Sequence, residues 1–260
     1  MAGFDETQIT RAILDAYHRK LSDSIVSDVV IVGAGPSGLT AAYHLARRDL
    51  RVTLVEKRLS PGGGIWGGGM AMNEVALQTE ALPILDELGI RHRPVQETLH
   101  TADAMELACG LCLKALQAGV TILNLTAVED ICIHDDRVTG VVVNRTTVYE
   151  SLPVDPLMLQ SRAVLDATGH EASVLQTLQR RGLFRGSAGG ALAGEGPMNA
   201  NAGERFVVEK AGEVYPGLWV SGMGVCAAYG GPRMGPIFGG MLLSGQRVAE
   251  LITAALRKST

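Results

Sequence analysis

The chain has 260 residues, of which 47% are hydrophobic and 19% charged, and its formal net charge is −4. This length can bury a full core in one large domain, and the small negative charge argues against nucleic-acid binding. No apolar run is long enough to span a membrane, and the N-terminus lacks the basic and apolar regions of a signal peptide. We therefore expect a cytoplasmic protein with no nucleic-acid or membrane partner.

Hydrophobic periodicity and turn residues divide the chain into alternating helices and strands. The sequence predicts helices over 5–23, 37–48, 74–88, 101–118, 171–182 and 237–256, strands over 28–32, 51–55, 120–125, 127–134, 137–149, 163–169 and 218–222, and a long loop over 184–204. The two strands on either side of Asp135-Asp136 alternate and suggest a hairpin. This order predicts an α/β fold, a doubly wound Rossmann-like sheet with an added antiparallel β-layer. We expect one dinucleotide-binding domain over 1–260, with the inserted β-section near 125–150.

The most informative motif joins the first predicted strand to the helix that follows it. Gly33 permits a tight turn, Gly35 lets a pyrophosphate approach the backbone, and Gly38 lets the helix pack closely on the strand. Phosphates then lie at a helix N-terminus, where free N–H groups favour negative charge. Glu56 ends the next strand, 18 residues after Gly38, where a carboxylate can accept hydrogen bonds from ribose hydroxyls. The whole unit predicts a site for a nucleotide with a ribose and a pyrophosphate.

A second glycine-rich segment, over 60–70, has six glycines in eleven residues. A flexible linker is one interpretation of this composition. The apolar side chains of Ile65, Trp66 and Met70 favour another, a loop that approaches a ligand closely.

Two polar residues, Asp155 and His170, occupy predicted loop positions around a strand. Asp155 precedes a proline, and His170 follows the strand-ending Gly169. A carboxylate and an imidazole can bind iron or a similar divalent metal and leave coordination positions open for a chelating substrate. Asp-Pro is also a common turn opener, and a single histidine is usually structural. The spacing alone leaves a metal site and a structural role both open.

A single arginine, Arg233, lies in a glycine- and proline-rich segment before an apolar helix. A guanidinium there can hold a carboxylate through two parallel hydrogen bonds. A plain surface arginine fits poorly with such apolar surroundings, so we predict ligand binding.

These motifs together resemble the thiamine thiazole synthase family over nearly the whole chain, from about residue 5 to residue 255. The family fold is similar to that of flavin-binding proteins. The most specific matches are Glu56-Lys57, the glycine loop over 61–70, Val154-Asp-Pro, Thr168-Gly-His, the segment 212–216, and the run Pro232-Arg-Met-Gly-Pro-Ile-Phe-Gly-Gly with the residues that follow it.

The resemblance implies an enzyme that consumes NAD as a substrate. Nicotinamide is lost, the freed ribose opens and condenses with glycine, and sulfur is added to give an ADP-linked thiazole carboxylate. By position, Asp155 and His170 would bind Fe(II), with one ligand supplied by a neighbouring subunit, and Arg233 would hold the glycine carboxylate. The family is similar to ring-like octamers, so we expect a homo-oligomer. The residues implied to hold the NAD-derived nucleotide are Ser37, Glu56, Lys57, Gly64, Val128 and Met223.

One position departs from the family pattern. Two residues before the metal-binding aspartate, the eukaryotic branch has a cysteine that donates its sulfur once, and the prokaryotic branch usually has a histidine. This chain has Pro153, which excludes sulfur donation from that position and predicts sulfide from solution as the donor, with multiple turnovers. Two alternatives stay open: an FAD-dependent oxidoreductase of the same fold, and a nucleotide-binding homologue that Pro153 has made inactive.

Overall fold

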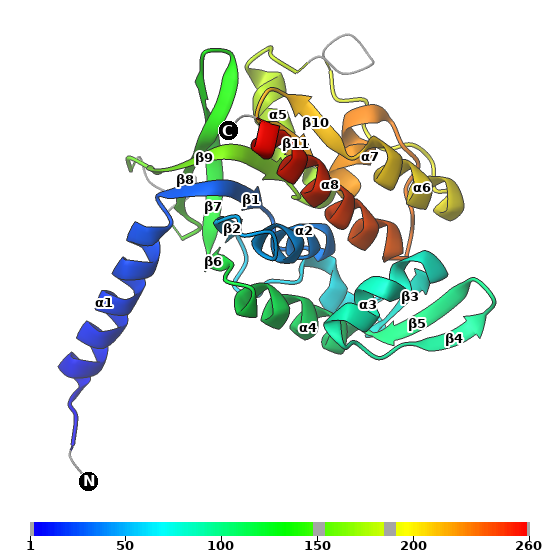
Figure 1. The fold of residues 1–260 in the computed structure, drawn as a ribbon, viewed down its shortest axis with the longest axis horizontal. Helices are drawn as coiled ribbons and strands as arrows, with labels where there is room; N and C mark the ends of the chain where they lie inside the picture. The colour runs from blue at the N-terminus through cyan, green and yellow to red at the C-terminus, as the bar shows by residue number, and fades with distance from the viewer. Residues whose placement is uncertain (1–2, 148–153, 185–190, 259–260) are drawn as a thin grey trace.

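The computed structural model describes residues 3–147, 154–184 and 191–258. Within these ranges the main feature is a central sheet of eight strands, in the order β10-β11-β9-β1-β2-β6, with β8 also paired to β9 and β7 paired to β8 (Figure 1). The strands are β1 (Val26–Val32), β2 (Val52–Glu56), β6 (Thr121–Asn124), β7 (Thr126–His134), β8 (Arg137–Arg145), β9 (Leu157–Asp166), β10 (Gly212–Tyr215) and β11 (Leu218–Val220).

Strand direction confirms the predicted fold class. β1 pairs in parallel with β2 on one side and with β9 on the other, and β6 and β11 continue the parallel sheet. The hairpin of β7 and β8 is antiparallel, as the alternating sequence predicts, and the structure adds that β8 pairs with β9. The fold is therefore a doubly wound parallel sheet with an added antiparallel layer.

Helices cover both sides of this sheet, except for α1 (Glu6–Asp23), which extends away from it (Figure 1). The others are α2 (Pro36–Ala46), α3 (Leu82–Leu88), α4 (Ala104–Gln117), α5 (Ser173–Arg180), α6 (Ala200–Lys210), α7 (Met223–Tyr229) and α8 (Gly239–Lys258), and three short 3-10 turns are η1 (Gly63–Gly67), η2 (Thr79–Ala81) and η3 (Gly169–Glu171).

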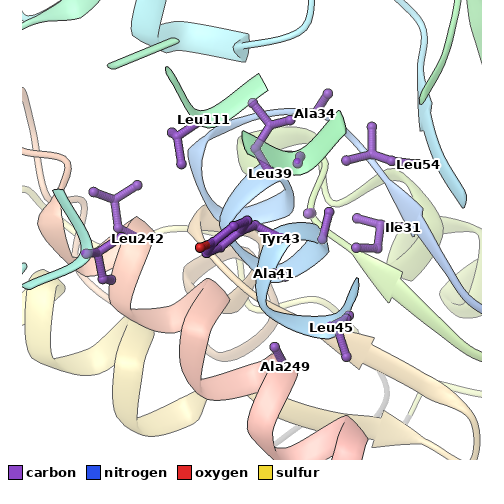
Figure 2. Close-up of a cluster of buried hydrophobic side chains, with 14 of the residues drawn as sticks. Ile31, Ala34, Leu39, Ala41, Tyr43, Leu45, Leu54, Leu111, Leu242 and Ala249 are labelled. Atoms are coloured by element: carbon purple, nitrogen blue, oxygen red, sulfur yellow. The ribbon is translucent and has the colours of Figure 1, made fainter. Parts of the chain in front are cut away.

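The central strand β1 shows how the sequence builds two cores. Its residues are apolar almost without interruption, as is usual for a parallel strand that is covered on both faces. Val29 and Ile31 belong to a cluster with α2, α4 and α8, whereas Val30 and Val32 belong to a cluster with β8, α5 and α7. Figure 2 shows the first cluster, with Tyr43 of α2 among its members. Because successive strand residues point to opposite faces, one strand supports both layers.

The helix α1 is confirmed, but it packs differently from the other helices. Asp5 and Gln8 form a capping box at its start, which stabilises the first turn. None of its 18 residues is buried, and α1 extends away from the body of the fold (Figure 1). Its apolar side chains, including Ile9 and Ile13, are exposed.

A second sheet corrects the first half of the predicted helix over 74–88, whereas the predicted helix over 101–118 is confirmed as α4, which begins three residues later than predicted. Three antiparallel strands, β3 (Glu74–Gln78), β4 (Arg93–Gln96) and β5 (Leu99–Asp103), are arranged in the order β3-β5-β4. The predicted helix over 74–88 is therefore wrong for its first half, since helical residues begin only at η2 and α3. Val75 and Leu77 are buried while Glu74 is exposed, which is strand alternation. The pairing partner β5 is distant along the chain, so local periodicity did not reveal it.

Two more helices correct predicted loops. The predicted loop over 184–204 is wrong near its end, where Asn199 caps α6 by accepting a hydrogen bond from the Ala202 N–H. The helix α7 lies inside a glycine-rich segment whose composition is typical of a loop. It begins after Gly222, whose φ of +63° favours glycine. Within the described ranges, no helix has both the length and the apolar character that crossing a membrane requires.

Candidate nucleotide-binding and active site

A pocket lies where the carboxyl ends of the central parallel strands meet. β1 has β2 on one side and β9 on the other, so the strand order reverses here, and ligands bind at such points in open α/β sheets. The pocket has a volume of about 480 Å³, which is within the range of small-molecule sites. Of the residues predicted from sequence, those that line it are Gly33, Gly35, Ser37, Glu56, Lys57, Gly64, Val128, His170, Met223 and Arg233, whereas Gly38 and Asp155 do not.

The three fingerprint glycines differ in whether and why the fold requires glycine at their positions. Gly33 has a φ of +101°, and a Cβ there would lie 2.6 Å from the carbonyl oxygen of Ala167. A Cβ on Gly38 would overlap the Gly33 carbonyl oxygen, so this glycine allows α2 to sit against the turn. A Cβ on Gly35 would meet no atom within 4 Å. The protein itself therefore does not require glycine at position 35, although a ligand close to the backbone would.

The acid at the end of β2 is held in place by backbone groups. Glu56 is buried, its Oε2 accepts the Ala34 N–H at 2.8 Å, and its Oε1 accepts the Arg58 N–H at 2.8 Å. Each carboxylate oxygen can accept a further hydrogen bond. Lys57, the next residue, forms an ion pair of 2.6 Å with Glu171, and both side chains are about half exposed. Glu171 was not predicted from the sequence.

The glycine loop over 60–70 is an ordered wall of the pocket. The Gly62 N–H donates to the Ala34 carbonyl at 2.7 Å, and Ile65 is fully buried. A Cβ on Gly63 would lie 3.0 Å from the Gly35 Cα, so the loop packs directly on the fingerprint. These contacts argue against a flexible linker and explain why glycines are needed.

Two serines tie the fingerprint helix to the last third of the chain. Ser37 on α2 is buried, and its hydroxyl bonds to that of Ser221 just after β11. The Gly222 N–H donates to the Ser244 Oγ of α8 at 3.0 Å. Met223 then begins α7 and faces the pocket. The C-terminal strand and helices therefore close the pocket over the fingerprint.

A buried aspartate shapes the turn that carries His170. Asp166 accepts hydrogen bonds from the N–H and hydroxyl of Thr168 and from the N–H groups of Val174 and Leu175, at 2.7–3.0 Å. Burial raises the pKa of this carboxyl, and these hydrogen bonds oppose the rise. Asp166 thus joins the end of β9 to the start of α5, and the turn between them carries His170 at the pocket.

One acid that the sequence did not reveal connects two predicted site residues. The Oε1 of Glu195 lies 2.5 Å from the Nδ1 of His170. The other carboxylate oxygen, Oε2, lies 3.3 Å from the Nε of Arg233. The Glu195 side chain is 16% exposed, whereas those of His170 and Arg233 are each 60% exposed. The one available signal was its position as the sole acid between residues 184 and 203.

The structure does not bring Asp155 and His170 together within one chain. Asp155 is exposed and precedes β9, whereas His170 follows the other end of the same strand. Ten residues of strand extend over roughly 30 Å. Across the described ranges, no cluster of three or more His, Cys, Asp or Glu residues could hold a metal ion. A metal site that uses both residues therefore requires two chains.

The parallel sheet, the glycine fingerprint at a helix start and the buried acid define a protein with a Rossmann-type fold, the class in which dinucleotides commonly bind at this position. Comparison with known proteins narrows this class. The Thi4 family model matches residues 10–238, so the chain belongs to the Thi4 family, as the sequence motifs predict.

Close relatives agree with this assignment. The thiamine thiazole synthase of Methanothermobacter thermautotrophicus is 49% identical to this chain, and the match covers 97% of this chain and 99% of the relative. The thiamine thiazole synthase of Thermotoga maritima is also 49% identical, and the match covers 96% of this chain and 97% of the relative. The crystal structure of Thermovibrio ammonificans THI4 matches with a TM-score of 0.94 at 44% identity, and it covers 98% of this chain and 100% of that one. The family and its named members support a role in thiamine thiazole biosynthesis.

Proposed function

We propose that this chain is a thiazole synthase that converts NAD, glycine and sulfide into an ADP-linked thiazole carboxylate and nicotinamide. The observation that carries the proposal is a single pocket of about 480 Å³ lined by the fingerprint, Glu56, His170 and Arg233. A nucleotide site and groups suited to a metal and a carboxylate thus share one cavity.

The nucleotide end of the pocket fits the ADP half of NAD. The space beside Gly35 is open, and the N-terminus of α2 points its free backbone N–H groups at an anion placed there. Glu56 lies on the pocket wall with its orientation set by two backbone amides, and it can accept from ribose hydroxyls. In this arrangement the ADP half stays fixed, while the nicotinamide-side ribose extends toward His170 and Arg233.

Arg233 suits the carboxylate of glycine. Its Nε is engaged by Glu195, and in the described part of the chain neither Nη group has a hydrogen-bond partner. Two parallel Nη donors match the geometry of a carboxylate. Holding glycine there would place its amine near the opened ribose, which favours condensation by proximity.

His170 and Asp155 suit a divalent metal shared between subunits. Imidazole and carboxylate ligands are typical for Fe(II), and two protein ligands leave positions for a substrate. His170 Nε2 has no partner among the described residues, and Asp155 is exposed and therefore accessible to another copy. When bound, Fe(II) would act as a Lewis acid and could carry sulfide. This arrangement needs at least a dimer, and the octamer implied by the family would supply it.

The cysteine positions favour sulfide from solution. Pro153 lies outside the described residues, and its side chain has no sulfur to donate. None of the chain's four cysteines lines the pocket. Burial raises the pKa of the Cys226 thiol to about 12, which keeps it protonated and unreactive.

The test is an anaerobic reaction of the purified protein with NAD, glycine, sulfide and Fe(II), analysed by mass spectrometry. We expect nicotinamide and an ADP-linked thiazole carboxylate in excess over protein, and no thiazole when sulfide is omitted. A yellow protein with a flavin spectrum would indicate the oxidoreductase instead. Tight NAD binding without product would indicate an inactive homologue.

A further inference from the structure

The contacts of Glu195 connect the two halves of the proposed reaction centre. One carboxylate oxygen meets the ring of His170, and the other meets the guanidinium of Arg233. We propose that Glu195 is a positioning residue, which orients His170 for metal binding and Arg233 for glycine at the same time. This inference rests on the proposed function, because it assumes those roles for His170 and Arg233.

The hydrogen bond to His170 selects one form of the imidazole. An ionised carboxylate can only accept hydrogen bonds, so the Nδ1 that faces Glu195 must carry a proton. In the neutral ring, Nε2 is then the nitrogen with a free lone pair, which is the one available to a metal. A carboxylate behind a metal-binding histidine fixes both its tautomer and its ring orientation. At 2.5 Å between Oε1 and Nδ1, the contact is close enough for this purpose.

The contact with Arg233 sets the direction of its guanidinium. Glu195 occupies the Nε side at 3.3 Å. The two Nη groups remain on the opposite edge, where they can bind a carboxylate through two hydrogen bonds. A guanidinium held on one edge loses less conformational freedom when it binds a ligand on the other.

The backbone around Glu195 is held on both sides, so the carboxylate is positioned before any ligand binds. The Gly194 N–H donates to the Ala227 carbonyl at 3.0 Å, and the Gly196 N–H donates to the Gly231 carbonyl at 2.8 Å. The Glu195 side chain is also the least exposed of the three, at 16%. Exposed ion pairs contribute little, but a mostly buried carboxylate with two fixed partners can orient both.

Substitutions at this position test the inference with a readout other than turnover. Binding of Co(II), used as a spectroscopic substitute for Fe(II), is measured by anaerobic absorption titration of the assembled protein, and the glycine KM is measured separately. We expect Glu195→Ala to weaken Co(II) binding by about 10- to 100-fold, the usual effect of losing such a partner. We also expect it to raise the glycine KM while the NAD KM changes little. Glu209→Gln, an exposed acid on α6, is the matched control and should change neither property.

Glu195→Gln refines the test, since an amide keeps only one acceptor oxygen. It can hold His170 or Arg233 but not both, so we expect either Co(II) affinity or the glycine requirement to change. If the alanine variant does not fold, this variant decides, and unchanged values for both properties would refute the inference. Equal Co(II) binding by the wild type and His170→Ala would overturn the metal site and this inference together. Loss of binding in His170→Ala, with normal binding in Glu195→Ala, would overturn this inference alone.

Discussion

Glu204 on α6 provides a quantitative test of the packing between α6 and α8. The residue is 6% exposed, and its Oε2 accepts the Gly240 N–H of α8 at 2.5 Å. The Oε1 atoms of Glu204 and Gln78 are buried, and hydrogen bonding from the Gly240 N–H and the Gln78 side chain favours the ionised carboxylate of Glu204. Burial raises the pKa of Glu204 from 4.5 to about 7, and the nearby Glu80 carboxylate adds to the rise.

The direction of the pH effect follows from this shift. The folded protein binds the Glu204 proton more tightly than the unfolded chain does. The stability that protonated Glu204 contributes is therefore complete below about pH 4.5, and it is lost as the pH rises through about 7. At about 1.36 kcal/mol per pKa unit, the rise from 4.5 to about 7 corresponds to about 3 kcal/mol.

The perturbation is Glu204→Gln, which keeps the shape and one acceptor oxygen but cannot ionise. We expect the free energy of unfolding to be similar for both proteins at pH 5, and to be higher for the variant by about 3 kcal/mol at pH 8. Denaturant unfolding at both pH values, at one protein concentration, measures this. Glu209→Gln on the same helix is the control. An equal difference between variant and wild type at the two pH values would refute the reasoning.

Three further predictions concern the pocket. Gly35→Ala should weaken NAD binding without changing the Tm, since a Cβ there meets nothing within 4 Å. Gly38→Ala should instead lower stability by about 1–3 kcal/mol, because its Cβ would overlap the fingerprint backbone. Similar Tm values for the two variants would contradict this prediction. Arg233→Ala should raise the glycine KM by about tenfold or more with little effect on the NAD KM. Equal increases in the glycine KM and the NAD KM would contradict the role proposed for Arg233. Asp155→Ala and His170→Ala should each abolish metal-dependent turnover, while mixed oligomers of the two regain activity; mixtures that stay inactive would argue against a ligand shared between subunits.

The glycine-fingerprint end of the pocket was predictable because its determinants are local. Gly33, Gly35 and Gly38 lie in six consecutive residues, and Glu56 ends the strand that pairs directly with β1. Each of these residues acts through the conformation of a short segment or through its immediate neighbour. A pattern within one βαβ unit therefore carries nearly all of the information.

The second sheet and α7 were not predictable in the same way. β3 becomes a strand by pairing with β5, which follows only after η2, α3 and β4. The helix α7 forms in a glycine-rich segment where packing of residues such as Val225 and Cys226 outweighs low helix propensity. Long-range burial decides both cases, and no local window of sequence contains it.

By itself, the sequence determined the family and the fold class, and it supplied the residues proposed to bind a nucleotide, a metal and a carboxylate. Only the tertiary structure decided how these residues are grouped. Asp155 and His170 are near neighbours in the sequence, yet a full strand separates them. Glu195 is 25 residues from His170, yet it joins His170 to Arg233 because the loop that carries it bonds to the segment after α7. Separation along the chain is a poor guide to distance wherever a rigid strand or a long-range backbone pairing intervenes.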